Sequence, residues 1–275
     1  MASPRRTRYT LRSVAVVYIA LLVLAPLVVI IAKVVGDGWT AFADAVSSEA
    51  ALTAFRLTAE VAGIAVVLNT LFGVGLALLL ARHRVPGARL LNAVVDLPIS
   101  VSPIVVGLAL VLVYGPVDGW FGRALADTGI DVIYSTPGMV LATTFVSLPL
   151  VLREVLPVLH EEGDEMEQAA KVLGAGALQR FARITLPTIR SALSYGVVLS
   201  LARSIGEFGA VRVVSGGISG AGQTQTVTLL IEDKYEQLEG GTYQLALVLV
   251  AVTVLAIVIV SLRRRPRTDG VAGSA

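Results

Sequence analysis

The stretch that decides how this chain is arranged is residues 167–187, EQAAKVLGAGALQRFARITLP. It is polar, it contains the closely spaced glycines Gly174 and Gly176, and it ends at Pro187. Its surroundings are very different, because 55% of the 275 residues are hydrophobic and only 15% are charged, whereas soluble domains carry about 25% charged residues. The position of this polar segment between apolar blocks therefore has to be explained.

The apolar residues fall in blocks long enough to cross a membrane as helices of about 20 residues. We predict six spans, at Ser13–Ala32, Leu57–Ala81, Leu90–Val113, Gly138–Val155, Ser191–Val211 and Tyr243–Leu262. The first block exceeds the apolar region of a secretory signal, which is about 7–15 residues long, so we expect it to be a retained helix. The sequence predicts an all-α membrane protein with about six transmembrane helices.

The basic residues indicate the orientation of these spans. Most of the 22 lysines and arginines lie near the chain ends or beside the loops that follow the second and fourth spans. The exceptions are Lys33, Arg56, Arg123, Arg203, Arg212 and Lys234. Because basic residues accumulate on the cytoplasmic side, we expect both termini there. Five or seven spans would place one arginine-rich terminus outside.

This orientation divides the chain into a cytoplasmic basic segment (1–12), a transmembrane domain (13–262) and a cytoplasmic basic tail (263–275). The opening stretch then lies in a cytoplasmic loop, residues 157–190. No second soluble domain is predicted.

Within this loop, apolar residues recur at helical spacing and form one stripe. They are Met166, Ala170, Leu173, Ala177, Phe181 and Ile184. Because each glycine costs a helix about 1 kcal/mol relative to alanine, we predict two short helices joined at residues 174–176, and we expect Pro187 to stop or reset the second one. Such a helix pair could lie on lipid headgroups or press into a groove on a partner.

The residue order in the loop favours the partner. Gln168-Ala169-Ala170, Gly174 and Ile184-Thr185-Leu186-Pro187 resemble the EAA signature E-A-A-x3-G-x9-I-x-L-P of permease subunits of ATP-binding-cassette (ABC) importers. Every fixed position matches except the first, where Gln168 replaces glutamate and Glu167 sits one residue earlier.

This resemblance implies a type I ABC importer permease fold, in which the loop docks on a separate ATPase dimer that consumes ATP. The implied coupling residues are Glu167, Gln168, Ala169, Ala170, Leu173, Gly174, Phe181, Ile184, Leu186 and Pro187. Ala169, Ala170 and Gly174 would allow close backbone approach, and Leu173 or Phe181 would be the apolar anchor.

Two polar segments lie within the predicted spans. The first, residues 96–107 (DLPISVSPIVVG), contains two prolines and two serines. In lipid, a helix interrupted in this way needs neighbouring helices or an aqueous cavity to satisfy its backbone carbonyls. It is either a kink that shapes helix packing or a bend that lines a translocation path, for which Pro98, Ser100, Ser102 and Pro103 are candidates.

The second, residues 203–211 (RSIGEFGAV), contains two charges. Charged groups in a membrane are usually paired or face a cavity. Arg203 and Glu207 are four residues apart and could pair; alternatively, Arg203 could offset the charge of an anion, with Ser204 as a hydrogen-bond donor. The candidate path or gate residues here are Arg203, Ser204, Gly206, Glu207, Phe208 and Gly209.

Together with V-V-S-G-G-I at 213–218, these segments are similar to the W-type sulfate/thiosulfate importer permeases, to which molybdate and tungstate permeases are close. The resemblance covers about residues 55–262. It implies a multi-pass subunit of a prokaryotic cell membrane that transports a tetrahedral oxyanion. The implied partners are an ABC ATPase dimer, an extracytoplasmic solute-binding protein and a second permease subunit, either T-type or another copy. We expect residues 226–238 to form a short outer helix that contacts the binding protein.

Other classes of function find less support. The chain has no cysteine, and His83 and His160 are far apart in sequence, so we expect no metal site. We also expect no cofactor bound by this chain, no catalytic residues and no nucleic-acid partner. An intramembrane enzyme would need paired catalytic groups, whereas the spans offer only Asp96 beside Glu60 and Glu207. A membrane scaffold would not need the EAA spacing.

Overall fold

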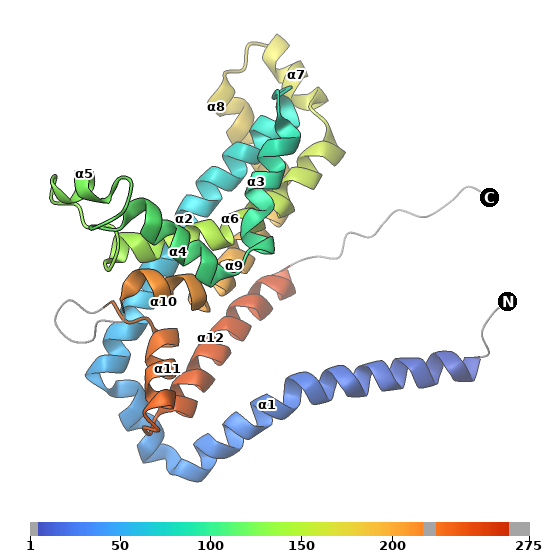
Figure 1. The fold of residues 1–275 in the computed structure, drawn as a ribbon. Helices are drawn as coiled ribbons and strands as arrows, with labels where there is room; N and C mark the ends of the chain where they lie inside the picture. Colours follow the sequence, from blue (N-terminus) through green and yellow to red (C-terminus); the bar gives the residue numbers. More distant parts are fainter. Residues whose placement is uncertain (1–4, 217–223, 264–275) are drawn as a thin grey trace.

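The computed structural model describes residues 5–216 and 224–263, and within these ranges every regular element is a helix (Figure 1). In chain order the elements are α1 (Arg5–Ser47), α2 (Glu49–Arg82), α3 (Ala88–Ser100), α4 (Pro103–Tyr114), α5 (Gly122–Ala126), α6 (Thr136–Glu162), α7 (Glu165–Val172), α8 (Ala177–Arg180), the π-helix η1 (Phe181–Thr185), α9 (Leu186–Ile205), α10 (Gly209–Ser215), α11 (Val227–Glu236) and α12 (Thr242–Arg263). The all-α prediction is confirmed. Parts of the predicted segments 1–12 and 263–275, and of the stretch 213–218, lie outside the described residues.

The number of spans agrees with the sequence once a bent pair is counted as one. In the described part of the chain, five helices are long and apolar enough to cross a membrane, and α3 with α4 makes a sixth if the two form one broken span. An apolar helix is the natural solution in lipid because it satisfies its backbone polar groups internally.

The third predicted span, Leu90–Val113, is wrong as a single helix. It breaks after Ser100, and α3 and α4 meet at an angle of 114°. Val101 and Ser102 are extended, with ψ angles of 140° and 134°. Ser102 directly precedes Pro103, and the residue before a proline avoids the helical region. Pro103 then begins α4, where its missing N–H is not needed.

The fifth predicted span, Ser191–Val211, is also placed incorrectly. Its helix α9 ends at Ile205, and a separate helix, α10, starts at Gly209. Helix α10 packs closely on α4: a Cβ atom on Gly107 would lie 2.9 Å from the Ala210 carbonyl oxygen, and one on Gly209 would lie 3.0 Å from Pro103 Cβ. Two broken helices therefore meet where glycines permit a close approach.

Three long helices, α2, α6 and α9, form the centre of the bundle. Val151 of α6 packs between two glycines: a Cβ atom on Gly73 of α2 would lie 2.9 Å from Val151 Cβ, and one on Gly196 of α9 would lie 3.0 Å from Val151 Cα. Small residues of this kind bring membrane helices into close contact. Polar side chains also join these three helices, as described below.

Helix α1 lies apart from this centre. It runs away from the other helices in Figure 1 and contacts α12 and α2. None of its most apolar 18-residue window is buried. Helix α11 packs on α2 and α12, which confirms the predicted short helix at 226–238.

Candidate functional site

The loop between α6 and α9 folds into the two short helices that the glycines predict. Helix α7 ends at Val172 and α8 begins at Ala177. Gly174 between them has a φ of +86°, a left-handed conformation that glycine adopts without steric cost. Figure 1 shows α7 and α8 at the opposite end of the molecule from α11.

The tip of this loop exposes large apolar side chains. Val172 and Leu173 are each 88% exposed and Leu178 is 80% exposed, and no residue of α7 is buried. We refer to Val172, Leu173 and Leu178 as the apolar tip. Leu173 was predicted as an anchor, whereas Val172 and Leu178 were missed because neither belongs to the helical stripe of the sequence.

The predicted stripe does not form one face. Phe181 is half-buried and packs against the apolar cluster that includes Leu159 and Ile189. Of the two alternative anchors, Leu173 is therefore the exposed one, and the Phe181 side chain faces the bundle. Ile184 is half-buried as well.

The helix does not stop at Pro187, contrary to one of the two expectations. The chain stays helical from Ala177 to Ile205, and η1 gives way to α9 just before this proline. Because a π-helix bonds at i→i+5, the hydrogen-bond register is reset here. Pro187 lies in the first turn of α9, where a missing N–H is tolerated; Leu186 and Pro187 are both exposed.

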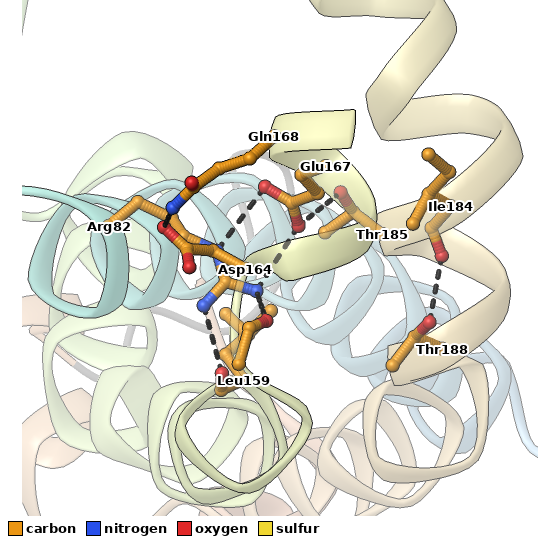
Figure 2. Close-up of polar contacts among 9 residues, drawn as sticks. Arg82, Leu159, Asp164, Glu167, Gln168, Ile184, Thr185 and Thr188 are labelled. Carbon is orange, nitrogen blue, oxygen red and sulfur yellow. Dashed lines mark hydrogen bonds and ion pairs between the residues drawn. The ribbon is translucent and has the colours of Figure 1, made fainter. Parts of the chain in front are cut away.

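Glu167 and Gln168, at the start of the stretch 167–187, have different partners (Figure 2). Gln168 is exposed and donates from Nε2 to Asp164 Oδ2 at 2.6 Å. Glu167 faces the bundle, where its Oε1 lies 3.1 Å from Arg82 Nη2 and accepts a 2.9 Å hydrogen bond from Thr185 Oγ1. Ala169 is exposed and Ala170 is half-buried.

Two candidate path residues of the second polar segment, Arg203 and Glu207, form an ion pair. Arg203 Nη1 lies 2.5 Å from Glu207 Oε2, and the Glu207 side chain is only 1% exposed. The other oxygen, Oε1, accepts a 2.9 Å hydrogen bond from the Ala210 N–H at the start of α10. Of the two alternatives that the sequence left open, the structure therefore shows the pairing.

Ser204 takes part in a polar junction between helices. It is 5% exposed, and its Oγ lies 3.2 Å from Ser147 Oγ of α6. Asn69 of α2 donates to the same Ser147 oxygen at 2.8 Å and to Ser200 Oγ of α9 at 3.2 Å. We call Asn69, Ser147, Ser200 and Ser204 the buried polar junction. Asn69, Ser147 and Ser200 were not predicted, because single polar residues in a span carry no spacing signal.

The remaining candidates gather around the break between α3 and α4. Ser100 and Ser102 are exposed, Pro98 is buried and Pro103 is half-buried. Pro103 contacts Gly209 of the second polar segment, so the fold brings the two predicted segments together.

The other candidates of the second segment, Gly206 and Phe208, lie between the end of α9 and the start of α10. Gly206 is the C-cap of α9, and Phe208 packs against the cluster that includes Val106 and Val211. Asp96 pairs with Arg153 of α6, with Oδ1 and Nε 2.9 Å apart.

Comparison with known proteins relates these features to a family. Residues 73–265 match the family described as binding-protein-dependent transport system inner membrane component. The sulfate transport system permease protein CysW of Synechococcus elongatus is 43% identical over 250 residues, covering 90% of this chain and 86% of that protein. CysW of Escherichia coli is 41% identical over 242 residues, covering 86% and 81%.

A related subunit and a solved structure agree. The sulfate transport system permease protein CysT of Salmonella typhimurium is 38% identical over 217 residues, covering 79% of this chain and 77% of the relative. A chain of the bacterial alginate ABC transporter, solved with an alginate pentasaccharide-bound periplasmic protein, has a TM-score of 0.73 at 17% identity and covers 96% of this chain and 95% of its own length. That likeness shows the fold.

The match spans most of the membrane-crossing helices, and the relatives above are named as permease proteins. The prediction of a transport subunit, rather than an enzyme, is confirmed by this kinship. The chain belongs to the family of binding-protein-dependent transport system inner membrane components.

Proposed function

We propose that this chain is a permease subunit of an ATP-driven importer of sulfate or thiosulfate. It would cross the inner membrane of a prokaryotic cell several times, with both termini in the cytoplasm. The relatives named for sulfate transport, up to 44% identical to this chain, favour sulfate over the molybdate or tungstate of the alternative prediction.

The observation that carries the coupling part of the proposal is the apolar tip. Its three side chains are 80–88% exposed and lie where the two short helices α7 and α8 meet. No residue of α7 is buried. Fully burying one Leu side chain is worth about 1.5–3 kcal/mol. A partner that covers the tip would gain this energy, and we assign that partner as the ATPase dimer.

The lipid-surface alternative is less consistent with the geometry. A helix pair lying on headgroups would turn its apolar stripe toward the membrane as one continuous face. Here the stripe is divided, because Phe181 and Ile184 point inward while Leu173 points outward. Two apolar surfaces facing different ways suit a loop held between the bundle and a partner.

Other partners follow from the same architecture. A second permease subunit, T-type or another copy of this chain, would cover part of the exposed apolar surface of α1. The solute-binding protein would approach the opposite end, near α11. ATP would be hydrolysed by the ATPase, without a cofactor bound by this chain.

Transport would proceed by alternating access, with the anion passing close to the α4–α10 contact. Because Arg203 is already paired with Glu207, its charge is partly neutralised. The exposed hydroxyl groups of Ser100 and Ser102 are therefore the better donors to an oxyanion in this proposal.

The coupling proposal is tested by Leu173→Asp in the complete transporter. We expect insertion to be retained, co-purification with the ATPase to be lost and sulfate uptake into proteoliposomes to stop. Leu238→Asp is the matched control for insertion and ATPase co-purification only, because Leu238 is 90% exposed on the segment after α11, at the opposite end of the molecule from α7. Normal ATPase binding and uptake in Leu173→Asp would refute the proposal.

A further inference from the structure

One arginine at the end of α2 joins several parts of the molecule. Arg82 is the last residue of α2, and its Nη1 donates to the Leu159 carbonyl at 2.9 Å while its Nη2 donates to the Gly163 carbonyl at 2.7 Å. Both acceptors lie at the C-terminal end of α6, where the last four carbonyls of a helix lack intrahelical partners. The same guanidinium also reaches α7, where Nε and Nη2 donate to the two carboxylate oxygens of Glu167 at 3.2 and 3.1 Å.

Glu167 extends this connection to the next helix. Its Oε1 accepts from Thr185 Oγ1 of η1 at 2.9 Å, and Thr185 is only 4% exposed. A single ion pair therefore ties α7 to the ends of two long helices, α2 and α6, and to the start of a third, α9. We call Arg82, Glu167 and Thr185 the α7 latch (Figure 2).

Helix α7 has little else to hold it in place. No residue of α7 is buried, and its apolar end at Val172 points outward with 88% of that side chain exposed. The latch, in contrast, is well shielded, with side-chain exposures of 14% for Arg82 and 16% for Glu167. A shielded bidentate pair loses less of its strength to solvent than an exposed one.

We propose that the α7 latch positions the docking loop and passes its displacement to α2 and α6. This inference rests on the proposed function, because it requires the loop to be moved by the ATPase. Arg82 and Glu167 are then positioning residues: they do not touch the ATPase, and they determine whether its closure reaches the membrane helices.

Arginine suits this position better than lysine would. The planar guanidinium offers several donors in a fixed arrangement, and four of its hydrogen bonds are used here. An ammonium group has three donors and cannot bridge the carboxylate and both carbonyls in the same planar geometry. Arg82→Lys should therefore keep the charge and only part of the coupling.

The test compares Arg82→Gln and Glu167→Gln with Arg84→Gln and Glu165→Gln in the complete reconstituted transporter. The controls remove the same charges two residues away; Arg84 and Glu165 are exposed, and in the described part of the structure their side chains make no hydrogen bond or ion pair. The readouts are ATPase co-purification, ATP hydrolysis and the sulfate taken up per ATP.

We expect both latch variants to bind the ATPase within about twofold of wild type but to lose at least about fivefold in uptake per ATP, the lower end of typical coupling between sites. The double variant should lose no more uptake per ATP than the more impaired single variant, because each single substitution already removes the same link. Arg82→Lys should fall in between, and the controls should behave as wild type.

A nitroxide label provides a readout that does not depend on transport. The chain has no cysteine, so Lys171→Cys on α7 gives a single labelling site. Arg82→Gln and Glu167→Gln should increase the mobility of this label in the electron paramagnetic resonance spectrum, and Arg84→Gln should not.

Wild-type coupling in both latch variants, additive losses in the double variant or an unchanged label spectrum would each overturn the latch. Loss of ATPase binding in Glu167→Gln would overturn it as well, because the pair would then belong to the docking surface. These outcomes differ from failure of the proposed function, which is seen when Leu173→Asp still binds the ATPase.

Discussion

Replacing Asn69 by alanine should loosen the contact between the three central helices. Asn69 is fully buried in α2, and its amide donates to Ser147 on α6 at 2.8 Å and to Ser200 on α9 at 3.2 Å. Ser147 also bonds to the Thr143 carbonyl within its own helix. The serine therefore keeps this bond and its contact with Ser204 when the amide is removed, and the loss is confined to the two interhelical bonds of Asn69.

The magnitude follows from these two bonds. Interhelical hydrogen bonds in membrane proteins average about 0.6 kcal/mol each, with a maximum of about 1.7, so losing both should cost about 1.2 kcal/mol. The wild-type side chain also has one unfavourable feature, since Asn69 Oδ1 has no partner in the described part of the chain. Alanine removes this unsatisfied acceptor but leaves a small cavity, and these two effects oppose each other. We expect a net loss of about 1 kcal/mol in the free energy of unfolding.

The assay is reversible unfolding in bicelles, with a double-mutant cycle between Asn69→Ala and Ser147→Ala. The cycle should show a coupling energy of about 0.6 kcal/mol, since it isolates one interhelical bond. Thr70→Ala is the control, because the Thr70 hydroxyl donates to the Val66 carbonyl of the same helix. If Asn69→Ala is no more destabilising than Thr70→Ala, or if the cycle shows no coupling, the reasoning is refuted.

Substitutions at two further positions test the packing and the paired charges. Gly196→Val should destabilise the protein by about 1–3 kcal/mol, a typical overpacking cost, because a Cβ atom there would lie 3.0 Å from the Val151 backbone; Gly196→Ala should cost less, and an equal cost in bicelle unfolding would contradict this. Glu207→Gln, which can still accept from the Ala210 N–H, should cost about 1 kcal/mol or less because Arg203 is partly exposed. Glu207→Ala, which also loses that bond, should cost about 1–3 kcal/mol, and the reverse order in the same assay would refute the capping role.

The sequence predicted the spans well where apolar residues run without interruption and poorly where prolines and glycines lie inside a span. The region 90–113 scores as one apolar block, although Pro103 favours an extended residue before it and the chain turns by 114°. In the region 191–211, hydropathy continues past Gly206, but the helix ends there. Hydropathy measures how apolar a segment is and does not report where its hydrogen-bond ladder breaks.

For the candidate site, motif spacing identified the loop but not the direction of its side chains. The glycines at 174 and 176 predicted the bend. Helical periodicity placed Leu173 and Phe181 on one stripe, but Leu173 is exposed whereas Phe181 packs against the bundle, because the loop contacts the bundle at one end only. Arg82 was not predicted as a site residue, since nothing in a single sequence links it to a glutamate 85 positions away.

The exposed tip and the shielded latch are two consequences of one requirement. A loop that docks on a partner must keep its apolar residues exposed, so it cannot use them to attach itself to its own bundle. Polar contacts have to hold it instead, and these are strong only where solvent is partly excluded, as it is around Arg82 and Glu167. The glutamine at the first EAA position fits this division, because Gln168 faces outward and bonds only within α7 and its cap, while Glu167 supplies the inward carboxylate. The departure from the EAA pattern therefore leaves the α7 latch intact, and any effect of Gln168 should be confined to the surface that meets the ATPase.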